Sequence, residues 1–210
     1  MPEPFTSLSA VALVLLQDNI DTDAIIPSRE IRAVSKVGLA DGLFANWRYM
    51  SGAERVPNPK FVLNDPNYRG AQVLLTGGNF GCGSSREQAV WAIREFGIRA
   101  IIASSFGAIF YRNCLRNGVL PASLPRAALE QIGKWVASDP QQNLVQIDLT
   151  RASVLAAGRE WIFEIDTDAR QELIDGLDEI DRTLKLSEQI KAFREADMVR
   201  RPWVYGLESL

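Results

Sequence analysis

One stretch constrains the fold of this chain more than any other, because a strand pattern, a glycine-rich loop and a helix pattern follow one another without a break. The strand pattern is the apolar run Gln72–Leu75. Four glycines follow it within seven residues: Gly77, Gly78, Gly81 and Gly83. Glycine lets the backbone approach a neighbouring segment or a ligand closely. We therefore expect a strand, a tight loop and then the N-terminus of a helix.

The helix pattern after the loop carries apolar residues on one face, at the spacing i, i+3, i+4, i+7: Ala89, Ala92, Ile93 and Phe96. Ser84 with Glu87, and Ser85 with Gln88, have capping-box spacing, which predicts that a serine caps this helix. A helix N-terminus offers free N–H donors and partial positive charge, and Arg86 adds a planar donor group suited to a carboxylate or a phosphate. These features predict an anion site with hydroxyl groups beside it. The plainer interpretation is a capped helix after a tight turn.

The loop matches none of the common phosphate or nucleophile motifs. No Gly-Lys-Ser/Thr follows the glycines, so the loop is not a P-loop. Arg86 stands where the dinucleotide-binding fingerprint has its third glycine. Neither serine lies in a Gly-x-Ser-x-Gly motif.

The chain contains no histidine and only two cysteines, Cys82 and Cys114. These counts exclude Ser-His-Asp triads, Cys-His pairs and imidazole bases. Two cysteines cannot by themselves hold an iron–sulfur cluster or a Cys₄ zinc site, so we expect no metal or cofactor in this chain alone. Any general base must be a carboxylate, Lys, Tyr, a thiolate or an activated hydroxyl. Cys114 shares a predicted helix face with Phe106 and Phe110 and is interpreted as a packing residue; Cys82 is interpreted as structural.

Length and charge limit the function classes. The 210 residues are 47% apolar, which is ample for a core, and the net charge of −3 gives no basic surface for nucleic acid. The apolar runs are too short to span a membrane, and the N-terminus lacks the basic region of a signal peptide. Two cysteines in a chain of this size favour reduced thiols. We expect a cytoplasmic protein that binds neither nucleic acid nor membrane.

Short strand patterns alternate with helix patterns along the chain. We expect strands at Ser9–Leu16, Gln72–Leu75, Ile98–Ala103, Leu144–Asp148 and Trp161–Asp166, with a hairpin at Ala157–Gly158. We expect helices at Asp41–Trp47, after Ser105, at Arg126–Val136 and from Asp168 onward. The proline-rich segment Ser51–Asn67 is expected to be a long loop. This pattern predicts an α/β or α+β fold with a mixed sheet.

Several stretches resemble the swivelling domain of the aconitase superfamily. Asn79–Ala89 resembles the signature Asn-Phe-Gly-x-Gly-Ser-Ser-Arg-Glu-His-Ala, and Asn19–Pro27 resembles a second signature. Further matches follow the order found in small subunits of this superfamily and cover nearly the whole chain: Leu43–Tyr49, Ser105–Asn113, Asn117–Pro121, Asp175–Ile180 and Arg201–Trp203. The resemblance implies one swivelling β/β/α domain over residues 1–210, a mixed sheet flanked by helices, with a helical C-terminal tail at about 168–203.

The resemblance also implies a function. It implies the small subunit of a two-subunit hydro-lyase, active only with a large subunit that carries a [4Fe-4S] cluster. The implied reaction isomerises 2-isopropylmalate to 3-isopropylmalate by dehydration and rehydration, in leucine biosynthesis. One alternative is a paralogue that acts on citramalate, dimethylmalate or homoaconitate. Another is a non-catalytic subunit that kept the fold, against which the presence of Ser84 and Arg86 argues.

The resemblance assigns the family's site residues to matching positions of this chain. Ser84 matches the catalytic serine of the family, and Ser85 and Arg86 match its carboxylate-binding residues. Thr22 and Asp23 match a segment that borders the substrate cleft in relatives, so we expect them to orient the site. On spacing alone, the two carboxylates of this segment favour a turn in which side chains bond the local backbone.

The chain departs from the family at several positions. Lys36 stands where relatives have an arginine that binds a substrate carboxylate, so we expect Lys36 to contact the substrate; a solvated surface lysine is the equal alternative. Gln88 and Leu186 replace two common histidines, and Gly77-Gly78 replace larger polar residues. These departures leave the substrate side chain open at this point.

Overall fold

The computed structural model describes residues 3–31, 35–52, 54–176 and 179–206. The chain divides into two compact units, Pro2–Gly176 and Leu177–Leu210, which are described separately. The predicted arrangement of one domain with a helical tail stays a prediction. Among the described residues, no helix is long and apolar enough to cross a membrane.

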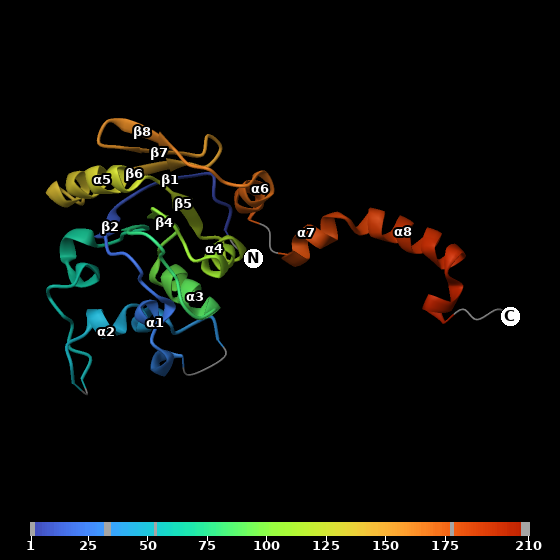
Figure 1. Ribbon diagram of the computed structural model, residues 1–210, viewed down its shortest axis with the longest axis horizontal. Helices are drawn as coiled ribbons and strands as arrows, with labels where there is room; N and C mark the ends of the chain where they lie inside the picture. Colours follow the sequence, from blue (N-terminus) through green and yellow to red (C-terminus); the bar gives the residue numbers. More distant parts are fainter. Residues whose placement is uncertain (1–2, 32–34, 53, 177–178, 207–210) are drawn as a thin grey trace. The chain divides into compact units, whose positions relative to one another are not determined.

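A parallel four-stranded sheet forms the centre of the first unit (Figure 1). Its strands, in spatial order, are β2 (Ala12–Leu15), β3 (Val73–Thr76), β4 (Ala100–Ala103) and β5 (Leu120–Ser123). Helix α3 (Glu87–Phe96) connects β3 to β4, and α4 (Ala108–Arg116) connects β4 to β5. Every residue of β3 and β4 is buried, as expected for parallel strands that are covered on both faces.

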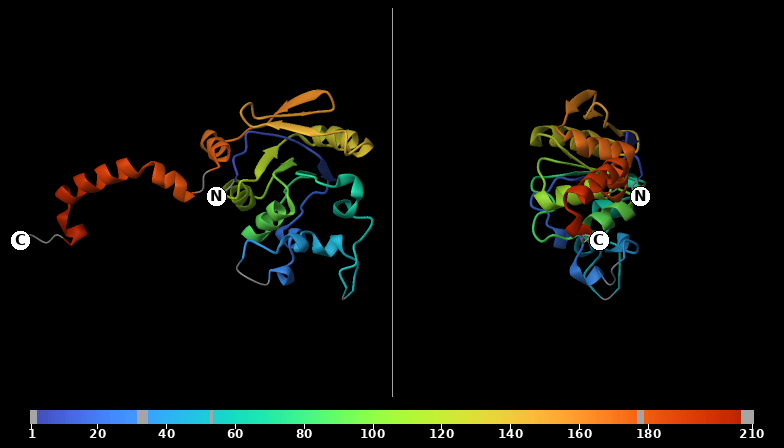
Figure 2. Two further views of the ribbon diagram at one scale, coloured as in Figure 1. Left: turned by 180° about the vertical axis from the view of Figure 1, so that it is seen from behind. Right: turned by 90° about the vertical axis from the view of Figure 1, so that its right-hand side faces the viewer.

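An antiparallel sheet lies on one face of the parallel sheet. Its strands, in spatial order, are β1 (Ser7–Ala10), β6 (Val145–Asp148), β7 (Ser153–Ala156) and β8 (Arg159–Ile162). Figures 1 and 2 show this sheet, the parallel sheet and helices α3 and α4 as successive layers. The predicted β/β/α fold is therefore confirmed, with one refinement: the expected mixed sheet is two sheets, one purely parallel and one purely antiparallel.

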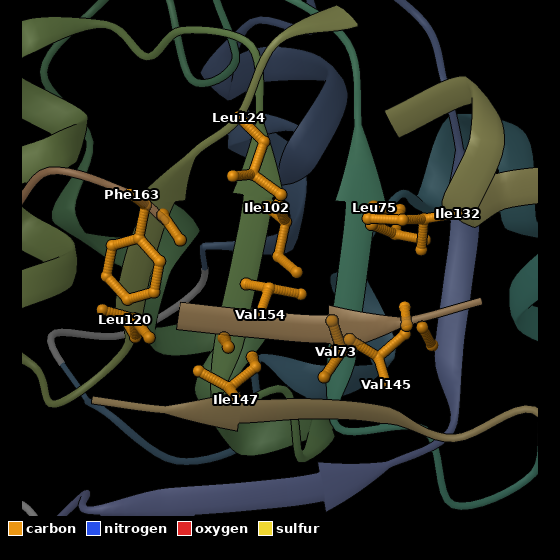
Figure 3. Close-up of a cluster of buried hydrophobic side chains, with 14 of the residues drawn as sticks. Val73, Leu75, Ile102, Leu120, Leu124, Ile132, Val145, Ile147, Val154 and Phe163 are labelled. Atoms are coloured by element: carbon orange, nitrogen blue, oxygen red, sulfur yellow. The ribbon is translucent and has the colours of Figure 1, made fainter. Parts of the chain in front are cut away.

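Two hydrophobic clusters hold these layers together, because side chains alternate between the two faces of each central strand. Val73 and Leu75 of β3 point, like Ile102 of β4, toward the antiparallel sheet, where Ile147 and Val154 meet them (Figure 3). The intervening Leu74 packs on the opposite face, against α3 and α4. Helix α5 (Arg126–Ser138) packs on β2, β3 and β4 of the parallel sheet through its predicted apolar face, in which Leu129, Ile132 and Val136 are fully buried.

The expected strand Ser9–Leu16 is wrong as a single element. The chain forms β1 in the antiparallel sheet, passes through Val11 and enters the parallel sheet as β2. The apolar residues are continuous across this crossing, so the pattern carries no signal for the break. Strands β5 and β7 were not predicted. Pro121 lies within β5 and argues against a strand, but β5 is the edge strand, where proline is tolerated.

The remaining predictions concern short elements and the C-terminal segment. Helix α2 (Ala45–Arg48) is shorter than the expected Asp41–Trp47, because Phe44 takes a left-handed conformation with φ of 50°. The hairpin at Ala157–Gly158 joins β7 to β8, and both residues have positive φ. The other helices are α1 (Thr22–Ile25), α6 (Thr167–Asp175), α7 (Glu179–Lys185) and α8 (Ser187–Arg200). Part of the matched segment Asp175–Ile180, residues 177 and 178, lies outside the described residues.

The packing between the two sheets generates a stability prediction. Ile147 of β6 is 2% exposed and faces the parallel sheet, whereas Leu155 of β7 is 42% exposed. Ile147→Ala should lower the free energy of unfolding by about 2–5 kcal/mol, because it removes buried methyl groups and leaves a cavity. Leu155→Ala, on the same sheet, should cost less than about 1 kcal/mol. Urea unfolding of both variants measures the difference, and equal losses would contradict the described packing.

Candidate active site

The glycine loop runs from the end of β3 to the start of α3, as predicted, but the helix begins later than the capping boxes required. Helix α3 starts at Glu87 with Arg86 at its N-cap, and no side chain caps it. The predicted capping by Ser84 or Ser85 is therefore wrong. Both serines are exposed in the loop before the helix. The N–H of Ala89 donates to the carbonyl of Arg86 at 3.2 Å, and the N–H groups of Glu87 and Gln88 find no acceptor among the described residues, as an anion site requires.

Glycines are required at two positions of this loop because other parts of the chain lie against them. Gly81 has φ of 70°, and a Cβ atom there would lie 2.1 Å from Cγ of Phe110. A Cβ atom on Gly77 would lie 2.5 Å from the carbonyl oxygen of Gln17. The N–H of Gly81 donates to the carbonyl of Ile20 at 2.8 Å. The loop is thus held by close contacts with Gln17, Ile20 and Phe110.

The segment after β2 brings the second predicted motif to the loop. Asp21 caps the short helix α1 by accepting from the N–H of Ala24 at 2.7 Å, so the carboxylate serves local structure. The N–H of Thr22 donates to the carbonyl of Cys82 at 3.0 Å. The Thr22 hydroxyl, 2% exposed, donates to the carbonyl of Ser84 at 2.8 Å and lies 3.4 Å from the Ser84 Oγ.

These contacts assign the hydrogen between the two hydroxyl groups. A threonine hydroxyl has one hydrogen to donate, and Thr22 gives it to the carbonyl of Ser84. In the longer contact the Ser84 hydroxyl is therefore the donor and the Thr22 oxygen the acceptor. Thr22 holds both the backbone and the side chain of Ser84.

Asp23 forms an ion pair with Arg86 and fixes one end of its guanidinium group. The Nη1 atom of Arg86 contacts the carboxylate of Asp23 and also lies 3.4 Å from the carbonyl of Ile26. The Nε and Nη2 atoms donate to no other residue among those described. One edge of the guanidinium group is thus anchored, and the other remains able to hold a carboxylate.

The start of α4 completes a cavity of about 300 Å³. Its lining brings together residues from three separate segments: Thr22, Asn79, Gly81, Cys82, Gly83, Ser84, Ser85, Arg86, Gly107, Ala108, Ile109, Phe110 and Asn113. Four predicted site residues, Thr22, Ser84, Ser85 and Arg86, line this cavity, and Asp23 contacts it through Arg86. Sequence reasoning gave no site role to Asn79, Ile109 or Asn113, although Ser105–Asn113 had been matched to the family.

Lys36 does not line this cavity. Its ammonium group lies 5.2 Å from the centre of the Trp91 ring on α3. The following loop is held by Glu95, whose carboxylate accepts from the backbone N–H groups of Gly38, Leu39 and Ala40 at 2.6, 2.6 and 2.9 Å. Burial acts to raise the pKa of Glu95, but these three donors outweigh it and lower the pKa. The contact between Lys36 and a substrate stays a prediction.

The two cysteines take different positions, and both are free thiols. Cys114 is fully buried on α4, and burial raises the pKa of its thiol well above the usual value. The prediction that Cys114 is a packing residue is therefore confirmed. Cys82 is half-buried and lines the cavity. Among the described residues, no three Cys, Asp or Glu side chains gather into a group that could hold a metal ion, so this part of the chain does not fit an iron–sulfur cluster.

An uncapped helix N-terminus, an anchored arginine and a hydroxyl pair lie together at the edge of the parallel sheet, in a chain of the aconitase class. The family model described as Aconitase C-terminal domain matches residues 3–127, which contain the whole cavity.

Relatives identify the branch of that superfamily. The 3-isopropylmalate dehydratase small subunit of Cupriavidus necator is 55% identical over 204 residues, covering 97% of this chain and 98% of that protein. That of Methylibium petroleiphilum is 43% identical, covering 96% and 97%. The crystal structure of the 3-isopropylmalate dehydratase from Methanocaldococcus jannaschii superposes with a TM-score of 0.62 and 29% identity, covering 90% and 99%. The chain belongs to the family of 3-isopropylmalate dehydratase small subunits.

The close approach at Gly81 generates a prediction for the site. Gly81→Ala should destabilise the protein by roughly 2–5 kcal/mol, because the methyl group strains a left-handed backbone and overlaps the ring of Phe110. Gly158 is the matched control, since it also has φ of 70° but would place its Cβ in open space. Gly158→Ala should cost only about 1 kcal/mol. If urea unfolding gives both variants the same loss, the contact with Phe110 is not what requires glycine.

Proposed function

We propose that this chain is the small subunit of a two-subunit hydro-lyase that interconverts 2-isopropylmalate and 3-isopropylmalate in leucine biosynthesis. The observation that carries the proposal is the convergence of Ser84, Ser85 and Arg86 in one cavity at the uncapped N-terminus of α3. The reaction removes water to give isopropylmaleate and adds it back with the opposite regiochemistry. The relatives named above favour this substrate over citramalate, dimethylmalate or homoaconitate.

Dehydration requires a base that removes a proton from carbon next to a carboxylate, and we assign this role to Ser84. A serine hydroxyl is a poor base in water. Positive potential stabilises its alkoxide, and both the N-terminus of α3 and Arg86 supply such potential. The contact with Thr22 holds the Ser84 oxygen in one position, which supports the assignment of Thr22 as an orienting residue.

Ser85 and Arg86 are proposed to bind a substrate carboxylate. The free edge of the Arg86 guanidinium group and the amides at the start of α3 offer several donors to one anion. These donors also stabilise the charge that builds on the carboxylate when the proton is removed. Asp23 is proposed to orient Arg86 through their ion pair, because it fixes the opposite end of the guanidinium group.

The partner is proposed to be the large subunit of the dehydratase, and the [4Fe-4S] cluster is assigned to it. This assignment is supported by the donor set of the present chain, which has two cysteines and no histidine. The metal site therefore belongs outside this chain, and the residues described here act on the organic part of the substrate. We further propose a cytoplasmic location, where both thiols stay reduced.

The role of Ser84 is tested in the assembled enzyme. Ser84→Ala should lower kcat by at least ~10²-fold, the usual scale for general acid–base catalysis, with a much smaller change in substrate affinity. Ser7→Ala, on the exposed side of β1, is the control and should match the unsubstituted enzyme. Turnover of Ser84→Ala close to that of the control would show that Ser84 is not the base.

The assignment of the cluster to the partner is tested with the purified full-length chain. After anaerobic incubation with iron and sulfide, the chain alone should hold no stoichiometric cluster and should show no dehydratase activity, because it lacks the ligands. The same treatment in the presence of the large subunit is the control and should give both cluster and activity. Stoichiometric iron and sulfide on the chain alone would overturn the assignment.

A further inference from the structure

We propose that Asn117 is a positioning residue for the active site: it holds the Glu87 carboxylate away from Ser84 and so keeps the serine from becoming a helix cap. This inference rests on the proposed function, because it takes Ser84 as the base. It gives a task to a buried side chain that does not line the cavity. It also explains why the capping predicted from the sequence does not occur.

Asn117 ends α4 and is 3% exposed, and its side-chain amide has three partners. The Oδ1 atom accepts from Nε1 of Trp91 at 3.0 Å. The Nδ2 atom donates to the Glu87 carboxylate at 2.9 Å and to the carbonyl of Asn113 at 2.8 Å. An indole N–H can only donate, whereas a carboxylate and a carbonyl can only accept. These partners therefore fix which end of the amide faces Glu87.

The Glu87 carboxylate is thereby directed toward the end of α4. Glu87 and Trp91 are four residues apart on one face of α3, and both meet Asn117. Although Glu87 directly follows Arg86, it does not line the cavity, and neither does any other carboxylate among the described residues. The hydrogen bond from Asn117 thus keeps a negative charge off the wall of the anion site.

The sequence offers Glu87 a second arrangement, because Ser84 and Glu87 have capping-box spacing. In a capping box the serine oxygen accepts from the N–H of Glu87, and the carboxylate accepts from the N–H of Ser84. Such a box would occupy the Ser84 oxygen and one of the free amides of the anion site. Neither bond is present in the described part of the chain, where α3 begins at Glu87 and the carboxylate is bonded to Asn117.

The two arrangements compete for the same carboxylate. A hydrogen bond to a charged group contributes more to stability, on the usual scale, than a helix cap does. The bond from Asn117 therefore prevails in the wild-type chain. Without the donors of Asn117 this advantage is lost, so the capping box forms and Ser84 is drawn into it.

The first test removes the donors and then the carboxylate, in the enzyme assembled with its large subunit. Asn117→Ala should lower kcat/KM about 2- to 30-fold, which corresponds to the strength of a helix cap. The double variant Asn117→Ala, Glu87→Ala should recover most of this loss, because no carboxylate remains to complete the box. Asn143→Ala is the control and should match the unsubstituted enzyme. The amide of Asn143 donates to the carbonyl of Trp135 near the end of α5, and neither residue lines the cavity.

A second pair of variants leaves Asn117 in place and covers the case in which its substitution prevents folding. Glu87 is half-buried and belongs to neither hydrophobic cluster, so the core stays intact. Glu87→Asp is one methylene too short to reach Asn117 but can still complete a box with Ser84. It should lose activity about 2- to 30-fold. Glu87→Ala can form neither bond and should retain activity. A purely structural role of the bond between Glu87 and Asn117 predicts at least as large a loss in Glu87→Ala.

A third measurement follows the helix cap directly in the full-length chain, without turnover and without the large subunit. Hydrogen exchange of the backbone amide of residue 87 is measured by NMR. This amide has no acceptor among the described residues, so it should exchange rapidly in the wild-type chain and in Glu87→Ala. It should exchange more slowly in Asn117→Ala and in Glu87→Asp, where the Ser84 oxygen accepts from it. Loss of packing alone would speed exchange along the whole of α3.

Three results would overturn the role of Asn117. They are equal activity of Asn117→Ala and Asn143→Ala, equal loss in Asn117→Ala and in the double variant, and activity of Glu87→Ala no higher than that of Glu87→Asp. Unchanged exchange at residue 87 in Asn117→Ala and Glu87→Asp would overturn it as well. The exchange measurement stands even if Ser84 is not the base, and a failure of the cap leaves the role of Ser84 open to its own test.

Discussion

The site depends on direct backbone contact between three loops at the carboxyl edge of the parallel sheet. The loop after β3 accepts from the N–H of Asn19 and donates from Gly81 to Ile20, both at 2.8 Å. On its other side, Phe80 donates to Ser105 at 3.1 Å and accepts from Gly107 at 2.9 Å. Side chains larger than hydrogen do not fit at Gly77, Gly81 or Gly107. Because the carboxyl ends of neighbouring parallel strands meet at one edge, the loops after β2, β3 and β4 join there.

This backbone network leaves the polar groups of the cavity free for chemistry. The loop is held without using the hydroxyl groups of Ser84 and Ser85 as caps, so both remain on the cavity wall. Thr22 holds Ser84 through its hydroxyl group, and Asp23 holds Arg86 through an ion pair. The donors of two helix N-termini face the same space. A rigid frame with uncommitted donors is the arrangement that electrostatic stabilisation of a developing negative charge requires.

Local sequence patterns were sufficient to predict elements whose conformation depends only on their own residues. The apolar face of α5 follows from Leu129, Ile132 and Val136, and the turn at Ala157–Gly158 follows from its residue types. These patterns were insufficient for elements whose structure depends on pairing with a distant segment. One apolar run divides into β1 and β2 because its two halves enter different sheets. Pro121 is tolerated in β5 because, among the described residues, no strand pairs with the outer edge of β5.

The sequence by itself determined the strand, glycine loop and helix around residues 76–93 and the absence of histidine chemistry, since these depend on residue types and local spacing. Only the tertiary structure decided which residues share the cavity. It placed Thr22 against Ser84, 62 residues away, kept Lys36 at Trp91 outside the cavity, and brought in Asn113 from a third segment. The reason is physical. The wall of the cavity forms where neighbouring parallel strands end, and the order of those strands depends on burying apolar side chains between the two sheets, which no single segment determines.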